Sequence, residues 1–133
     1  MTAAVCVVVP FYNPGIRILA ECVASIQLQS FDDWELLLLD DGSTDGSLEW
    51  ARSLNDARIR VYTDGQNLGL IARLNQMVSL TDSPLIARMD ADDACMPNRL
   101  AMQFAAIGEG HSVCATGVVS CDDEMAPLGC RNS

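Results

Sequence analysis

Basic residues are scarce in this chain of 133 residues. Lys and Arg together number 8 against 18 Asp and Glu, which gives a formal net charge of −10 at pH 7. A nucleic-acid backbone is bound by a basic face, so this balance excludes nucleic acid as the expected partner. An acidic protein still binds a nucleotide when a divalent cation lies between the two. The length predicts one domain over residues 1–133, and an apolar content of 50% is enough to bury a core.

Long apolar runs are absent as well. The N-terminus has no basic segment, and the apolar run over residues 3–9 is too short for a signal peptide. No stretch approaches the length of a membrane-spanning helix. We therefore expect a cytoplasmic protein, in which any contact with the inner face of a membrane would come through a further region.

The cysteines lack the spacing of a metal site. The 6 cysteines form no C-x-x-C pair and no zinc pattern. Most lie in apolar runs, where a free thiol behaves as a small apolar group, so reduced core cysteines are predicted rather than a disulfide framework. Cys121 and Cys130 lie in polar sequence and are the exceptions.

Several catalytic motifs are missing. The chain has no G-x-x-x-x-G-K-[ST] loop, no G-x-G-x-x-G fingerprint and no G-x-S-x-G elbow. Their absence argues against P-loop NTPases, dinucleotide dehydrogenases and α/β-hydrolases. The single histidine, His111, lies in a Gly-rich turn without a suitable partner nearby, and we assign it no role.

Apolar runs alternate along the chain with segments of helical periodicity. Strands are predicted at residues 4–10, 34–39, 58–62, 84–89 and 112–119, the third of them at a sheet edge. Helices are predicted at residues 16–29, from a cap at Ser43 or Thr44 to about 53, after a turn at 67–69, and from Pro97 to about 107. Residues 122–129 are expected to form a polar turn.

Two of these helices have a predicted inner face. The first carries apolar residues at helical spacing, namely Leu19, Cys22, Val23 and Ile26. The helix after residue 69 carries Ile71, Leu74 and Val78 on one side.

This alternation predicts the fold class. Strands that alternate with helices form right-handed βαβ units, which give an α/β fold with a mostly parallel central sheet flanked by helices. In such a sheet, ligands bind beyond the carboxyl ends of the strands. Three predicted strands run directly into polar residues, at 10–13 (PFYN), 40–45 (DDGSTD) and 90–93 (DADD).

The acidic turn, residues 90–93, is a candidate metal site. Asp90 and Asp92 are one residue apart on a loop just past a strand, so both can reach a common point. Carboxylate oxygens suit Mg²⁺ or Mn²⁺ held jointly with substrate phosphates. A metal there would neutralise a diphosphate and stabilise it as a leaving group. The alternative is a solvated turn that caps the next helix.

The second acidic pair, Asp40 and Asp41, is a candidate nucleoside site. Carboxylates at a strand end accept hydrogen bonds from the N–H of a nucleobase or from ribose hydroxyls, and Gly42 allows the backbone to turn sharply. The alternative is an ordinary Asx-type turn and helix cap.

Two further candidates are an aromatic residue after the first strand and an arginine. An aromatic ring at residues 10–13 can stack on a base, with Asn13 fixing the loop, although aromatic residues at strand ends are often core. Arg73 can donate charge-assisted hydrogen bonds to a phosphate. Its alternative is a solvated or salt-bridged arginine on the surface of a helix.

Five blocks of the sequence together resemble the family 2 glycosyltransferases, which have the GT-A fold. They are VVVPFYN, LQSF at 28–31, LLLDDGSTDGS, QNLGLIARLN, and ARMDADD followed by MPNRL. They occur in the family's order and spacing over essentially the whole chain.

The resemblance implies a role for each matching residue. Tyr12 would lie against the nucleobase beside the backbone of Pro10, and Asp41 would hydrogen-bond the base with Asp40 close by. Asp90 would lie near the ribose and the metal, and Asp92 would be the main protein ligand of Mn²⁺ or Mg²⁺. Arg73 would contact a phosphate.

One part of the family pattern is absent. The family's general base lies in a later acidic motif followed by acceptor-binding helices, so it would fall beyond Ser133, and we interpret Asp122, Asp123 and Glu124 as a turn. The expected protein is a truncated GT-A domain. It would bind a nucleotide-diphospho-sugar, with a UDP-sugar favoured, for inverting transfer to a carbohydrate or lipid-linked acceptor in glycan or cell-surface polysaccharide synthesis. Alone, it would be inactive.

Two other functions stay open at this point. One is a non-catalytic module that binds a nucleotide-sugar or a partner. The other is a nucleotidyltransferase of similar fold, which would usually need a Gly-rich, basic loop soon after the first strand. Residues 13–17 have little of that character.

Overall fold

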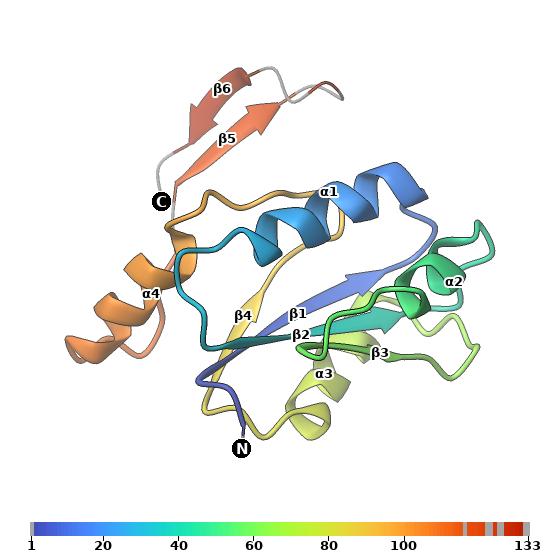
Figure 1. The fold of residues 1–133 in the computed structure, drawn as a ribbon, viewed down its shortest axis with the longest axis horizontal. Helices are drawn as coiled ribbons and strands as arrows, with labels where there is room; N and C mark the ends of the chain where they lie inside the picture. The colour runs from blue at the N-terminus through green and yellow to red at the C-terminus, as the bar shows by residue number, and fades with distance from the viewer. Residues whose placement is uncertain (1, 116, 122–123, 125–126, 132–133) are drawn as a thin grey trace.

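The computed structural model describes residues 2–115, 117–121, 124 and 127–131, and its strands and helices alternate along the chain (Figure 1). The strands are β1 (Val5–Phe11), β2 (Trp34–Asp40), β3 (Ile59–Tyr62), β4 (Leu85–Arg88), β5 (Val118–Cys121) and β6 (Pro127–Arg131). The helices are α1 (Ile16–Gln27), α2 (Ser47–Arg52), α3 (Leu70–Leu80) and α4 (Arg99–Gly108). The first four strands form a parallel sheet in the order β3-β2-β1-β4, which confirms the predicted architecture and the edge position of β3.

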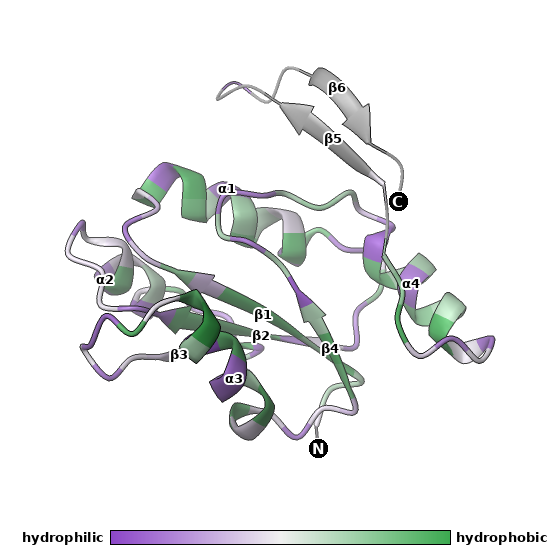
Figure 2. Ribbon diagram, turned by 180° about the vertical axis from the view of Figure 1, so that it is seen from behind, coloured by the Kyte–Doolittle hydropathy of each residue, from purple (hydrophilic) through white to green (hydrophobic). Residues whose placement is uncertain are grey.

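The central strands β1 and β2 have sequences that can be buried on both faces. They pair in register from Val5 and Trp34 to Phe11 and Asp40. Every residue of β1 is buried, as is every residue of β2 except Glu35. Figure 2 shows hydrophobic residues concentrated along these strands. A continuous apolar run was therefore a sound predictor of a central parallel strand.

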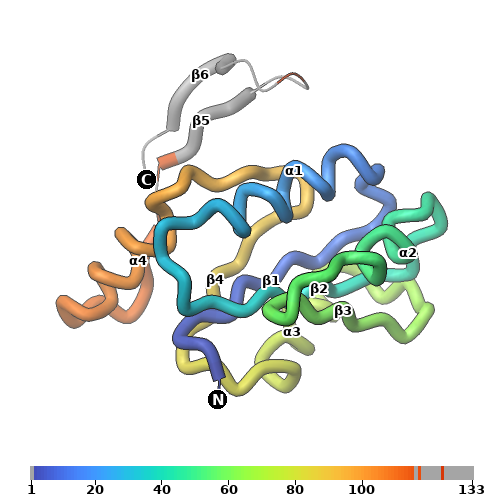
Figure 3. The backbone as a smooth tube through the Cα atoms, in the orientation of Figure 1, coloured from blue at the N-terminus to red at the C-terminus, as the bar shows by residue number. Residues whose placement is uncertain are grey.

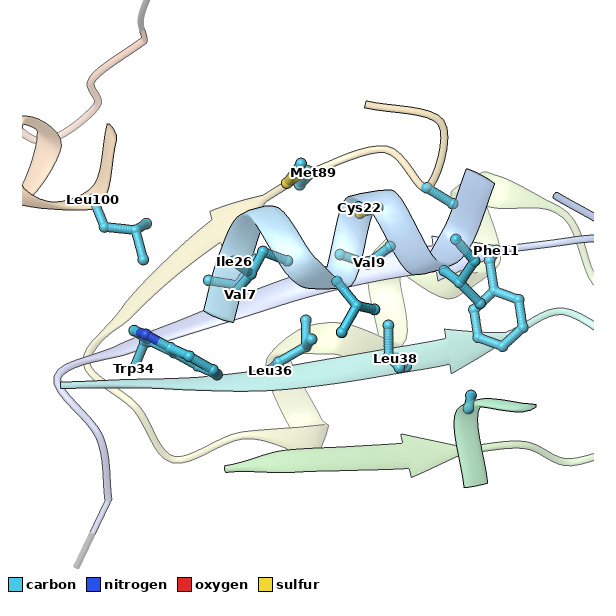
Figure 4. Packing of buried hydrophobic residues seen from close by; sticks show 14 of the residues in the cluster. Val7, Val9, Phe11, Cys22, Ile26, Trp34, Leu36, Leu38, Met89 and Leu100 are labelled. Atoms are coloured by element: carbon cyan, nitrogen blue, oxygen red, sulfur yellow. The ribbon is translucent and has the colours of Figure 1, made fainter. Parts of the chain in front are cut away.

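Helices cover both faces of this sheet, with α1 and α2 on one face and α3 on the other (Figures 1 and 3). On the first face, Val7 and Val9 of β1 pack with Ile26 of α1 (Figure 4). On the second face, Val8 packs with Met77 of α3. Within the described residues, no helix is both long and apolar enough to cross a membrane.

The inner face of α1 is the predicted one, but that of α3 is not. The four predicted residues of α1 are all buried: Leu19, Cys22, Val23 and Ile26. In α3, Ile71 and Val78 are 78% and 67% exposed, and Leu74 is only half-buried. The helix instead turns Arg73 and Met77 inward. Apolar spacing could not locate this face, because the most buried side chain of the helix is charged.

The loop after β2 also differs from the prediction. Helix α2 begins at Ser47, with Gly46 at its N-cap, rather than after a cap at Ser43 or Thr44. Those two residues bind the loop after β1. The amide of Asn13 donates to Ser43 Oγ at 3.0 Å, and the amide of Thr44 donates to Asn13 Oδ1 at 2.7 Å. Ser43 and Thr44 therefore join the loop after β2 to the loop after β1, instead of capping a helix.

The C-terminal part departs most from expectation. The strand predicted over 112–119 begins only at Val118, and it pairs antiparallel with β6 in a separate two-stranded sheet. β6 occupies the end of the predicted polar turn. Apolar content alone did not predict this pairing, because part of β6 lies in the segment expected to form a polar turn. Asp122 and Asp123 lie outside the described residues, and Glu124 lies in an exposed turn.

The thiols match the expectation where the structure describes them. Cys6, Cys22, Cys95 and Cys114 are free cysteines, the first two fully buried. Burial raises the pKa of the Cys22 thiol to about 12, so this side chain behaves as a small apolar group. The side chains of Cys121 and Cys130 lie outside the described part of the chain.

The revised inner face of α3 is testable with two neighbouring residues. Met77→Ala should lower the free energy of unfolding by roughly 1–2 kcal/mol, because Met77 loses its packing against the sheet. Val78→Ala, at a position that is 67% exposed, should change it by less than about 0.5 kcal/mol. Urea denaturation of the two variants measures both values. A larger loss for Val78→Ala would show that α3 packs by the face predicted from its apolar spacing.

Candidate functional site

The polar segments that follow β1, β2 and β4 lie at one edge of the sheet. β1 is the parallel neighbour of both β2 and β4. The pairing continues at the strand ends, where the amide of Asp41 donates to the carbonyl of Phe11 at 2.9 Å. On the other side, the amide of Met89 donates to the carbonyl of Val8 at 3.0 Å. The predicted gathering of the three segments at the carboxyl edge is therefore confirmed.

A cleft of about 360 Å³ opens at this edge, within the size range of small-molecule sites. Its lining is Pro10, Phe11, Tyr12, Asp41, Asn67, Gly69, Leu70 and Arg73. The predicted nucleotide-binding residues Pro10, Tyr12, Asp41 and Arg73 thus meet in one place. Tyr12 is 54% exposed, so its ring is available to a ligand.

The carboxylate of Asp41 is held by donors from the segment that leads into α3. Its Oδ1 accepts from the amide of Leu68 at 2.8 Å and from Arg73 Nε at 2.8 Å. Its Oδ2 accepts from the amide of Gly69 at 3.1 Å and from Asn67 Nδ2 at 3.1 Å. Burial tends to raise the pKa of Asp41, but these hydrogen bonds outweigh burial and lower it. The carboxylate therefore stays charged although its side chain is only 9% exposed.

Arg73 is fully buried, and the protein itself occupies its hydrogen-bond donors. Its terminal nitrogens donate to both oxygens of Asp64 at 2.8 and 3.0 Å, to the carbonyl of Gln66 at 2.6 Å and to Gln76 Oε1 at 2.9 Å. With Nε on Asp41, the five N–H groups of a guanidinium all have acceptors. Of the alternative, the salt-bridged arginine is confirmed, but its place on the surface is wrong, because the side chain is 0% exposed. A phosphate contact stays a prediction, and the contacts present make Arg73 one of the donors that fix Asp41.

Asp40 does not line the cleft. It is 0% exposed. Its Oδ1 accepts from the amide of Ser43 at 2.9 Å, and its Oδ2 accepts from Thr63 Oγ1 at 2.8 Å. With both oxygens engaged, Asp40 shapes the turn after β2, as the Asx-type alternative anticipated. Its direct contact with a nucleotide stays a prediction, which its complete burial does not favour.

The acidic turn brings together the carboxylates of Asp90, Asp92 and Asp93. One oxygen from each lies within 4.8 Å of the others, and all three residues are exposed. Partial burial, then the charges of Asp92 and Asp90, raise the pKa of Asp93. Crowded anionic oxygens of this kind fit a hard divalent cation such as Mg²⁺ or Mn²⁺. The sequence named the first two residues as candidate ligands, and the structure adds Asp93, which directly follows Asp92, as a third candidate.

The sequence comparisons identify the family. Residues 6–128 match the family described as Glycosyl transferase family 2. The chain belongs to this family. A relative is WfgD of Escherichia coli, a UDP-Glc:alpha-D-GlcNAc-diphosphoundecaprenol beta-1,3-glucosyltransferase. It is 31% identical over 101 residues, which cover 76% of this chain and 40% of the relative.

The structural comparisons identify the fold as GT-A. S. aureus TarS 1–349, solved in complex with UDP, matches with a TM-score of 0.72 and 26% identity over 82% of this chain and 32% of TarS. The mannosyltransferase PcManGT of Pyrobaculum calidifontis, solved with GDP-Man and Mn²⁺, matches with a TM-score of 0.70 over 92% of this chain and 36% of its own, and at 23% identity it shows the fold alone. The chain spans less than half the length of the curated relatives that it matches.

The pairing of Asp64 with Arg73 predicts a pH dependence of stability. Hydrogen bonds from Arg73 lower the pKa of Asp64 from 3.8 to about 2. The folded protein therefore binds this proton more weakly than the unfolded chain, and Asp64 stabilises the fold above about pH 4 but no longer near pH 2. The difference in free energy of unfolding between the wild type and Asp64→Asn should be largest at neutral pH and shrink between pH 4 and pH 2.

Denaturation series at several pH values measure this difference. Asp32→Asn is the matched control, because Asp32 is exposed and its substitution should have little effect at any pH. A difference for Asp64→Asn that stays constant down to pH 2 would contradict the ion pair.

Proposed function

We propose that this family 2 glycosyltransferase chain binds a metal-complexed nucleotide-diphospho-sugar, with a UDP-sugar favoured, for inverting sugar transfer. The observation that carries the proposal is the position of two different sites at one sheet edge. A cleft with an exposed aromatic ring and a charged carboxylate follows β1 and β2, and an acidic turn follows β4. A nucleoside suits the first site, and a metal-bound diphosphate suits the second.

The cleft offers complementary groups to a nucleobase. The ring of Tyr12 is exposed for stacking, and the backbone of Pro10 lines the same wall. Asp41 stays ionised and lines the cleft, so a base N–H would share one of its oxygens with the protein donors that already hold it. Its donors come from the loop and from α3, so the carboxylate needs little reorganisation when a ligand arrives.

The acidic turn would hold the cation, with Asp92 as the main ligand and Asp90 and Asp93 beside it. When bound, Mn²⁺ or Mg²⁺ neutralises the diphosphate and assists its departure. The protein needs such a cation because its formal charge of −10 repels phosphate. PcManGT, which has the same fold, was solved with a nucleotide-sugar and a divalent cation together, GDP-Man and Mn²⁺.

We further propose a carbohydrate or lipid-linked acceptor and a role in cell-surface polysaccharide or glycan synthesis at the cytoplasmic side of the membrane. The name of WfgD, which specifies UDP-Glc and a diphosphoundecaprenol-linked sugar, supports this class of acceptor. The alternative, a non-catalytic nucleotide-sugar module, would use the same cleft. The two are separated by a transfer assay rather than by a binding assay.

Nucleotide binding should depend on the acidic turn. Calorimetry of UDP binding should show clear affinity with Mn²⁺ and much weaker affinity in EDTA. Asp92→Asn should lose roughly 10-fold or more of the Mn²⁺-dependent affinity, because it removes an anionic ligand. Asp82→Asn is the control, since Asp82 is also exposed but precedes β4 at the opposite edge of the sheet. Equal UDP affinity with and without metal would remove the metal from the proposal.

The 133 residues alone should bind donor without transferring sugar at an appreciable rate. Inverting transfer requires a base that deprotonates the acceptor, and a positioned base contributes roughly 10²–10⁴-fold. None of the residues assigned above performs this role. Incubation with Mn²⁺, a panel of UDP-sugars and simple acceptors should release UDP only slowly, through hydrolysis. Robust, acceptor-dependent release would overturn this expectation and direct mutagenesis to Asp122, Asp123 and Glu124.

A further inference from the structure

Gln29 is a buried polar residue outside the cleft. It comes just after Leu28, the C-cap of α1, within the LQSF block, and is only 5% exposed. Its Nε2 donates to the carbonyl of Met96 at 2.7 Å and to that of Ser25 at 3.1 Å, and lies 3.2 Å from Cys95 Sγ. Its Oε1 accepts from the amide of Leu100 at 3.1 Å. The side chain therefore joins the end of α1 to the chain that leads from the acidic turn into α4.

That connecting segment, residues 94–98, belongs to no helix or strand. It links the acidic turn, residues 90–93, to the start of α4 at Arg99. Beside the Gln29 contacts, the amide of Cys95 donates to Ser25 Oγ at 3.1 Å. The amide of Ser30 donates to the carbonyl of Pro97 at 2.8 Å. The position of the connecting segment is thus set by the last turn of α1 and the residues that follow it.

The other side of the acidic turn is anchored by the sheet. β4 pairs with β1, and the amide of Met89 donates to the carbonyl of Val8 at 3.0 Å. Ala91, inside the turn, packs in the core and is 9% exposed. Cys22 of α1 lies with its Sγ 3.7 Å from the carbonyl of Asp90. The turn is therefore held from both ends, by β4 before it and by α1 after it.

Such anchoring has an energetic reason. The three carboxylates of the turn lie within 4.8 Å of one another and repel each other when no cation is bound. Repulsion favours conformations in which the carboxylates spread apart. Bringing them back together costs free energy, which lowers the affinity for a cation. Residues that hold the backbone of a ligand loop reduce this cost in advance, as outer-shell partners do at metal sites.

We propose that Gln29 is a positioning residue for the cation site: it holds the connecting segment on α1 and so keeps the acidic turn arranged to bind a divalent metal. The inference rests on the proposed metal role of the turn. Gln29 touches neither the cleft nor the carboxylates, so its effect should fall on the metal and leave the nucleoside site unchanged.

The test compares Gln29→Met with Gln27→Met. Methionine is close in size to glutamine but lacks the amide, so Gln29→Met removes the contacts to Met96 and Leu100. Gln27 is the last residue of α1, is exposed, and donates to Asp56 at 3.3 Å, away from the acidic turn. Electron paramagnetic resonance of free Mn²⁺ gives metal affinity in the presence of UDP. NMR titration with uridine gives the affinity of the nucleoside site without metal.

Gln29→Met should weaken Mn²⁺ binding by about 10-fold, the range seen for outer-shell substitutions, with uridine affinity unchanged within about twofold. Gln27→Met should match the wild type in both measurements. Equal Mn²⁺ affinity for Gln29→Met and the wild type would overturn the inference and leave the proposed function standing. Equal loss of Mn²⁺ and uridine affinity would also overturn it, because it would indicate general disruption. A wild type that binds no Mn²⁺ would overturn both proposals.

If Gln29→Met does not fold, Ser25→Ala decides the question. This variant removes the acceptor for the amide of Cys95, the donor to the carbonyl of Cys22 and the contact with Cys95 Sγ at 3.6 Å. It should weaken Mn²⁺ binding by about 3-fold, a smaller effect than that of Gln29→Met because fewer bonds are lost. Uridine binding should not change. A folded Ser25→Ala protein with wild-type Mn²⁺ affinity would overturn the inference.

Discussion

The cleft depends on one carboxylate, that of Asp41, which must stay ionised and fixed where little water reaches it. Removing such a charge from water is unfavourable unless donors replace the lost hydration. The segment leading into α3 supplies two backbone amides and an asparagine, and Arg73 of the helix supplies the charge. Arg73 is neutralised in turn by Asp41 and Asp64. The interactions that dock α3 on the sheet are therefore the same ones that build a wall of the binding site.

The sequence predicted the fold well where burial alone decides the structure. β1 and β2 are runs of apolar residues, and α1 repeats Leu19, Cys22, Val23 and Ile26 at helical spacing, so pattern and packing agree. The pattern failed for α3, whose inner face combines the buried charge of Arg73 with Met77 instead of the apolar residues expected. The pattern failed again near the C-terminus, because β6 forms by pairing with β5 in a segment whose composition predicted a turn.

The candidate site was predictable to the extent that topology gathers it. Parallel strands bring their carboxyl ends together, so Tyr12, Asp41 and Asp92 could be assigned to one edge without coordinates. Which carboxylate faces a ligand could not be deduced. Asp40 and Asp41 are neighbours in sequence, yet Asp40 accepts hydrogen bonds within the turn after β2, and only Asp41 lines the cleft. Gln29 was visible only as part of a motif, because its contacts join residues about 70 positions apart.

The pairing of Asn13 with the loop after β2 has a consequence for protein engineering. Asn13 has a φ of 48°, a conformation that few residues other than glycine and asparagine adopt readily, and its side chain accepts from the amide of Thr44. Tyr12 and Asp41 therefore lie in two loops that hydrogen bonds hold together. A designer who wished to transplant a different base preference into this scaffold would have to graft both loops together. A graft of either loop alone would break their junction before it changed what the cleft selects.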